Sequence, residues 1–151
     1  MHAEPAARSQ VKVIDSWALM AWLKDQQPAA EIVEGLCTLA RAHEIRLVIN
    51  IMNLGDVFYL TAKAKGTEAA EMVVEQLATM PLEVRPAPNA LVLEAARIKG
   101  RFPVAYADAF AAATAIREGA PLVTGDPEMK RLRREGLVQL EWIGSRASRG
   151  D

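Results

Sequence analysis

Short apolar runs bounded by turn residues alternate with longer segments of helical periodicity along this chain. The runs are residues 11–14, 46–51, 81–85, 121–124 and 137–142. The second run is almost wholly apolar after its first residue, which is typical of a strand covered on both faces. Strands that alternate with helices in this way predict an α/β fold with a mainly parallel sheet.

Glycine and proline residues divide the helical segments. We expect helices over residues 17–23, from Pro28 to about residue 43, over 53–65, from a cap at Thr67 onward, and over 89–99, 106–118 and 128–134. Glycine commonly follows the last helical residue, and Gly66, Gly100, Gly119 and Gly136 stand at expected helix ends. The apolar residues expected to face inward on the helix over 53–65 are Leu54, Val57, Phe58 and Leu60. Pro81 predicts that its strand lies near a sheet edge.

The length of 151 residues fits one domain with a proper core. We expect this domain over residues 11–143, between a flexible lead-in at 1–10 and a flexible tail at 144–151. The net charge of -1 excludes a global basic field for tight nucleic-acid binding. Cys37 is the only cysteine, which excludes an internal disulfide and suits a reducing compartment. The opening residues carry no apolar core of the kind that a signal peptide needs, and no apolar run approaches the length of a membrane helix, so a soluble cytoplasmic protein is expected.

Four aspartates differ in context from most of the 19 acidic residues, which lie on polar helix faces. Asp15 directly follows the first strand, and Asp126 follows the apolar strand at 121–124. Asp56 lies in the first turn of the helix after the second strand, and Asp108 lies near the start of an almost wholly apolar helix. Strand ends and the starts of the following helices share one edge of a parallel sheet. Three of these acids are therefore expected at that edge, and Asp108 joins them if its helix also begins there.

Taken singly, each aspartate has an ordinary explanation. Asp15 and Asp126 fit helix caps or turns, and Asp56 and Asp108 fit the favourable end of a helix dipole. Gathered within a few ångströms, however, carboxylates repel, and some must take up a proton unless a cation neutralises them. A hard divalent ion such as Mg²⁺ or Mn²⁺ accepts all-oxygen ligands of this kind. The four aspartates together therefore predict a metal site.

Other kinds of site find little support in the residues. His2, His43 and Cys37 show no spacing typical of a zinc site. No glycine-rich phosphate loop is present. Ser16 lacks a histidine partner that would favour an acyl-transfer triad.

Four segments resemble, in order and spacing, the successive motifs of PIN-domain proteins, and in particular of the VapC-like toxin ribonucleases of bacterial type II toxin–antitoxin pairs. They are residues 13–16, 53–57, 107–110 and 122–127. The resemblance covers about residues 11–142. It implies a three-layer α/β/α sandwich with a mainly parallel sheet, and an endoribonuclease site that depends on Mg²⁺ or Mn²⁺.

The resemblance also implies roles for particular residues. The catalytic and metal-binding cluster would consist of Asp15, Asp56, Asp108 and Asp126. Supporting residues would be Ser16, which also fits a helix cap, Thr124, and Asn53 one helical turn before Asp56.

The partners implied by the resemblance are an RNA substrate, a cognate antitoxin protein and a second copy of the chain. The apolar stripe of Ala70, Val73, Val74 and Leu77 serves a core or a dimer interface equally well.

Two residues depart from the family pattern. Asp56 stands where this group usually has Glu, so it is one methylene shorter and is expected to act through water or from a closer helix. Trp17 stands where a small polar residue is common. It either packs in the core, which we favour, or stands at the mouth of the site and stacks on a base.

The leading hypothesis is a metal-dependent RNA phosphodiesterase, in which Arg97, Lys99 and Arg101 either contact phosphates or form a solvated basic face. The alternative is a PIN-fold binding module for RNA or a protein partner whose catalytic site is weakened by Asp56. A third class, an aspartyl-phosphate enzyme with Asp15 as nucleophile, is disfavoured. Dehalogenase-like phosphatases place a second Asp where Trp17 stands, and no paired acids precede Asp15 as in phosphoreceivers.

Overall fold

The computed structural model describes residues 10–145. The predicted flexible lead-in and tail fall almost entirely on residues 1–9 and 146–151, which lie outside the described residues. Gln10, at the end of the predicted lead-in, is the first residue of a strand.

Five strands form one sheet in the order β3-β2-β1-β4-β5, and every pairing between neighbours is parallel. Their bounds are β1 (Gln10–Ile14), β2 (Ile45–Asn50), β3 (Leu82–Arg85), β4 (Leu122–Thr124) and β5 (Leu140–Trp142). The predicted α/β class is confirmed, and β3 lies at an edge as its proline indicates. The centre of the sheet is β1, with β2 on one side and β4 on the other.

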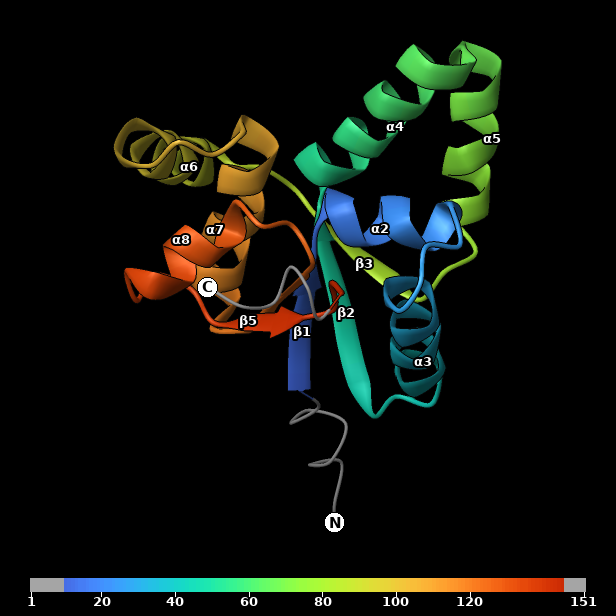
Figure 1. Ribbon diagram of the computed structural model, residues 1–151, viewed down its shortest axis with the longest axis horizontal. Helices are drawn as coiled ribbons and strands as arrows, with labels where there is room; N and C mark the ends of the chain where they lie inside the picture. Colours follow the sequence, from blue (N-terminus) through green and yellow to red (C-terminus); the bar gives the residue numbers. More distant parts are fainter. Residues whose placement is uncertain (1–9, 146–151) are drawn as a thin grey trace.

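Helices cover both faces of the sheet, which makes three layers (Figure 1). The helices are α2 (Ser16–Leu23), α3 (Ala29–Arg41), α4 (Ile51–Lys65), α5 (Thr67–Leu77), α6 (Asn89–Arg101), α7 (Tyr106–Glu118) and α8 (Met129–Arg134). The first four helices lie on one side, and α6, α7 and α8 lie on the other. Across the described residues, no helix combines the length and the apolar character that a membrane span requires.

Alternating strand residues build a separate core on each face. On β1, Val13 packs with α6, α7 and α8, whereas Ile14 packs with α2 and α3. On β4, Leu122 and Val123 divide in the same way. All four side chains are completely buried. A strand that is apolar on both faces fits only the middle layer of a sandwich, which is why the sequence pattern predicts this architecture.

Several helix ends agree with the sequence and others do not. Gly119 ends α7 as predicted, in the left-handed conformation with φ of 62°, which glycine adopts without strain. Gly100, by contrast, lies inside α6, which continues to Arg101. Thr67 is the first residue of α5 rather than its cap, because Gly66 occupies the N-cap position.

The start of α4 is also different from the prediction. Ile51, expected as the last strand residue, opens the helix, because the Asn50 side chain accepts a hydrogen bond from the Met52 amide at 2.9 Å and caps the helix there. Leu60, expected to face inward, is 37 % exposed. The predicted last strand is shorter than expected, since residues 137–139 are not in a strand.

Candidate metal centre

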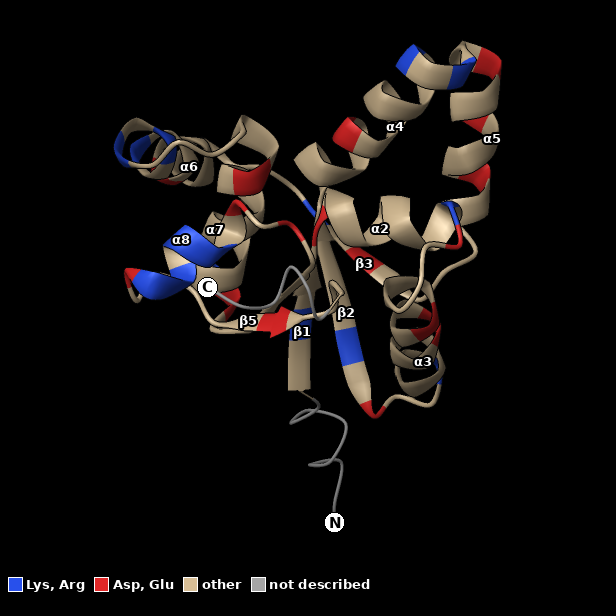
Figure 2. Cartoon of the chain, in the orientation of Figure 1, with Lys and Arg blue, Asp and Glu red and all other residues tan. Residues whose placement is uncertain are grey.

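The acids gather where the paired strands β1 and β4 end. Asp15 follows β1 directly, and Asp126 lies two residues beyond the last residue of β4. The two strands are in register at Ile14 and Val123, so both acids leave the sheet at the same edge. Figure 2 shows further acidic segments near this edge, on α4, at the start of α7 and before α8.

Asp15 is the N-cap of α2, where its Oδ1 accepts a hydrogen bond from the Ala18 amide at 2.9 Å. The residue is 1 % exposed, and its second oxygen, Oδ2, is buried with no hydrogen-bond partner among the described residues. Burial raises the pKa of Asp15 to about 7, against the opposing effects of the Thr124 hydroxyl and the Ala18 amide. An unpartnered buried carboxylate oxygen is costly unless it is protonated or meets a cation.

Asp108 reaches the same region from the first turn of α7 and is 8 % exposed. Burial raises the pKa of Asp108 to about 8, and the neighbouring carboxylates of Asp126, Asp15 and Glu128 act in the same direction. The helix start at Tyr106 therefore lies at the sheet edge where the other acids emerge. This is the placement that the sequence-based prediction required for Asp108 to join the other aspartates.

A short loop carries two more acids to Asp108. The Asp126 amide donates to Thr124 Oγ1 at 3.0 Å, and the Glu128 amide donates to Asp126 Oδ1 at 3.0 Å. Burial raises the pKa of Asp126. One carboxylate oxygen from each of Asp108, Asp126 and Glu128 lies within 4.8 Å of the other two. These three residues are called the acid trio below.

The sequence did not single out Glu128, which was expected to open a basic helix. The structure places it before α8, in the turn after Asp126. The sequence signal that could have identified Glu128 is its place two residues after the strand-end residue Asp126, with a proline between them.

Ser16 and Asn53 join three helices next to the acids. Ser16 Oγ donates to the Asn53 carbonyl oxygen at 3.2 Å. Asn53 Nδ2 donates to Ser16 Oγ at 3.1 Å and to the Ala107 carbonyl oxygen at 3.0 Å. Ser16 is the first residue of α2 rather than its cap, because Asp15 takes that place. The contacts tie α2, α4 and α7 together at the point where Asp15 and Asp108 emerge.

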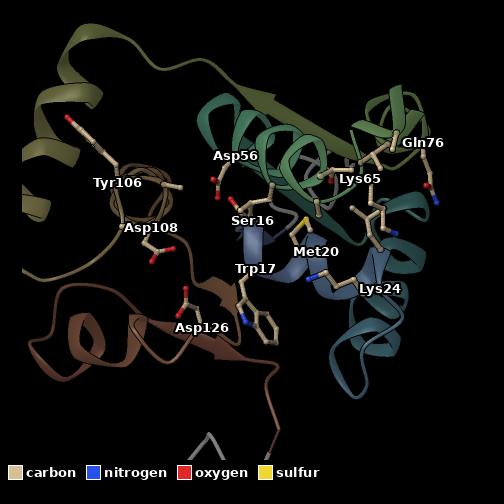
Figure 3. A pocket seen from close by; sticks show the side chains of 18 of the residues that line it. Ser16, Trp17, Met20, Lys24, Asp56, Lys65, Gln76, Tyr106, Asp108 and Asp126 are labelled. Atoms are coloured by element: carbon tan, nitrogen blue, oxygen red, sulfur yellow. The ribbon is translucent and has the colours of Figure 1, made fainter. Parts of the chain in front are cut away.

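Asp56 lies apart from the acid trio. It is half-buried in the second turn of α4 and borders the same cavity. Figure 3 shows Asp108 and Asp126 pointing toward each other, with Asp56 beside Ser16. The structure therefore brings Asp15, Asp108 and Asp126 together with Glu128, and Asp56 borders the same cavity outside the trio.

Trp17 packs in the core and also borders the cavity, while its stacking on a base stays a prediction. It is half-buried and packs against the core that contains α2 and α3. It also lines the cavity that the acids border, together with Met20 and Ser16. The cavity measures about 1140 Å³, and its remaining wall is mainly apolar and comes from α2, α4, α5 and the start of α7.

The donor set fits a hard divalent cation. It consists of carboxylate oxygens, of which one is buried without a partner, and burial together with mutual repulsion disfavours ionisation of Asp15 and Asp108. A divalent ion removes both penalties, and the oxygen ligands suit Mg²⁺ or Mn²⁺ rather than zinc.

Comparison with known families gives a match to the sequence model of the PIN domain over residues 12–135. The chain belongs to the PIN domain family. PIN domains use divalent metal ions in general, which agrees with the acidic cluster. Comparison with curated proteins finds no match.

Solved structures with the same fold include toxin–antitoxin proteins. VapBC2 from Rickettsia felis, bound to a DNA fragment from its promoter, aligns with a TM-score of 0.65 and 18 % identity over 87 % of this chain and 98 % of that chain. DNA-bound VapBC from Salmonella typhimurium aligns with a TM-score of 0.65 and 18 % identity over 89 % of this chain and 98 % of that chain. Mycobacterium tuberculosis VapC20, a sarcin-ricin loop cleaving toxin, aligns with a TM-score of 0.63 and 14 % identity over 80 % of this chain and 93 % of that chain. At these identities the likeness shows the fold.

Proposed function

We propose that this PIN domain is a divalent-metal-dependent endoribonuclease and the cytoplasmic toxin of a toxin–antitoxin pair. The observation that carries the proposal is the convergence of the acid trio beside Asp15, whose buried Oδ2 has no partner among the described residues. Four carboxyl groups that lie close together repel one another and destabilise the fold, so a bound cation accounts for their arrangement better than a structural role does. The structural neighbour VapC20, a sarcin-ricin loop cleaving toxin, supports RNA as the substrate class.

In this proposal Asp108, Asp126 and Glu128 hold the ion, with Asp15 beside them and Asp56, which borders the same cavity, completing the set through water. When bound, Mg²⁺ or Mn²⁺ supplies an activated water and charge neutralisation for an in-line displacement at phosphorus. Asn53, Ser16 and Thr124 keep the acid-bearing elements in place through the hydrogen bonds described above. Without a cation the acids repel the RNA backbone, so the chain needs the ion for substrate binding as well as for chemistry.

Basic residues lie within reach of an RNA that extends beyond the acids. Figure 2 shows Lys and Arg on α8 and at the outer end of α6. Arg97, Lys99 and Arg101 are exposed on α6, where they either contact phosphates or remain a solvated face. Their replacement by Ala separates these two roles, since only phosphate contacts change the salt dependence of RNA binding.

The apolar part of the cavity suits the cognate antitoxin. Met20, Leu60 and Met72 line it from three helices, and Met72 is 66 % exposed. Such a surface accepts the apolar face of an amphipathic segment. The neighbours solved as VapBC complexes support a partner of this kind. A homodimer also belongs to the proposal, and light scattering of the purified chain tests it.

The decisive experiment is cleavage of a defined RNA panel with Mg²⁺, Mn²⁺ or chelator. We expect metal-stimulated cleavage by the wild type and its loss in Asp108→Asn, with the fold retained. Asp25→Asn is the matched control, because Asp25 is exposed in the loop after α2 and the substitution is the same. Cleavage that persists undiminished in Asp108→Asn refutes the assignment. Calorimetric titration with Mn²⁺ distinguishes the alternative, since a weakened binding module takes up little metal.

A further inference from the structure

Trp17 contacts the loop that carries two members of the acid trio. It stands in the first turn of α2, two residues after Asp15. Its ring reaches Gly125, the residue immediately before Asp126. Figure 3 shows the indole lying alongside the loop of Asp126 at the edge of the cavity.

The approach of Trp17 to Gly125 is too close for any side chain at position 125. A Cβ atom on Gly125 would lie 2.3 Å from Trp17 Cη2 and 2.4 Å from Cζ3. On the same position, Gly144 Cα would lie 2.9 Å away. Ile143, the residue before Gly144, donates its amide hydrogen to the Thr124 carbonyl oxygen at 2.9 Å. The loop is therefore held between an indole ring and a second backbone segment.

The hydrogen bonds inside the loop do not fix its distance from α7. They link Thr124, Asp126 and Glu128 to one another, and so determine the shape of the loop alone. Asp108, the third member of the trio, belongs to a different element. The separation of Asp108 from the loop acids depends on the packing at both ends of the loop. After Glu128, Met129 is completely buried in the same core as α7, and at Gly125 the packing partner is the Trp17 ring.

We propose that Trp17 is a positioning residue that holds the Gly125–Glu128 loop at the distance from Asp108 at which the acid trio binds a divalent ion. The role rests on the proposed function, because it presumes metal binding by the trio. Its test therefore measures metal affinity directly, apart from RNA cleavage.

Trp22 provides a matched control on the same helix. It is half-buried like Trp17 and packs against the same core. Its Nε1 donates to Glu34 Oε2 at 2.6 Å, on the side of α3, and it does not line the cavity. Loss of either indole removes comparable packing, but of the two only Trp17 touches the Gly125–Glu128 loop.

The experiment is calorimetric titration of the chelator-stripped full chain with Mn²⁺, with urea unfolding of the same variants. We expect Trp17→Ala to raise the Kd for Mn²⁺ about 10-fold or more, as loss of the outer contacts of metal sites commonly does. Trp17→Phe should recover part of the affinity. Trp22→Ala should lose similar stability and keep the wild-type Kd. Equal Kd values for Trp17→Ala and wild type, or equal losses of affinity in Trp17→Ala and Trp22→Ala, overturn the proposal.

A second variant covers the case in which Trp17→Ala does not fold. Gly125→Ala places a methyl group where the indole stands, so it should also raise the Kd, and Trp17→Phe should reduce that penalty by changing the same contact. A Gly125→Ala chain with the wild-type Kd contradicts the role of Trp17. A folded wild type that binds no Mn²⁺ refutes the proposed function and this role with it. A wild type that binds Mn²⁺ with a Kd that neither variant changes refutes this role alone.

Discussion

The stability of the metal-free protein should fall as the pH rises through neutrality, because of Asp108. Its pKa is about 8 in the folded protein and 3.8 in its ordinary environment. Between these values the folded chain keeps a proton that the unfolded chain has lost. Stability from this group is therefore present at low pH and is lost as the pH rises from about 4 to about 8.

The size of the effect follows from proton linkage. One proton retained by the folded state lowers the free energy of unfolding by about 1.4 kcal/mol per pH unit. Mutual repulsion with Asp126 spreads the titration, so we expect about 1 kcal/mol per pH unit, or roughly 2 kcal/mol between pH 5 and pH 7. Asp15, with a pKa of about 7, adds a loss of the same sign. The pKa of Glu83 is lowered by its hydrogen bond with Arg46, so Glu83 has finished titrating below this range.

Urea unfolding in chelator, at several pH values in this range, tests the prediction. Asp108→Asn should flatten the slope by about one proton, while Asp25→Asn, at an exposed position, should leave it unchanged. Saturating Mn²⁺ should reverse the trend, because metal binds the deprotonated ligands and adds about 2.7 kcal/mol at 100 times its Kd. A wild-type slope that Asp108→Asn does not reduce refutes the reasoning.

Three further substitutions test the site and the loop. Glu128→Gln should raise the Kd for Mn²⁺ about 10-fold in calorimetry, because it removes one charged ligand of the trio; an unchanged Kd excludes Glu128 from the site. Asp56→Asn should weaken Mn²⁺ binding much less than Asp108→Asn, because Asp56 lies outside the trio; equal losses contradict this arrangement. Gly125→Ala should lower the free energy of unfolding by about 1–3 kcal/mol in urea, because the indole leaves no room for a methyl group, and normal stability shows that the loop yields.

The sheet and the strand-end acids could be predicted because their signals are local. Val13 and Ile14 are apolar on successive positions, which indicates a strand covered on both faces, and Asp15 follows at once. The same logic places Asp126 after β4. Parallel pairing of the two strands then brings these acids together with no further information.

Glu128 and Asp56 show where sequence reasoning ends. Glu128 adjoins a run of basic residues, so local composition indicates a solvated helix start, and only the turn after Asp126 directs it to Asp108. Asp56 lies at a helix start in the sequence, but whether it reaches the trio depends on how α4 is inclined to the sheet. That angle is set by packing among α2, α4 and α7, including the Asn53 contacts, and no single stretch of sequence encodes it.

The order of the strands has a consequence for synthesis on the ribosome. The strands β1, β2 and β3 are made in succession and can pair as they emerge, but β4 must be added beside β1 much later. Asp15 is therefore translated early, whereas Asp108, Asp126 and Glu128 join it only after most of the chain has left the exit tunnel. Pairing between strands so distant in the chain is slow to form. A nascent chain thus carries no complete acid trio, and the proposed metal site forms only after Glu128 has been made and β4 has paired with β1.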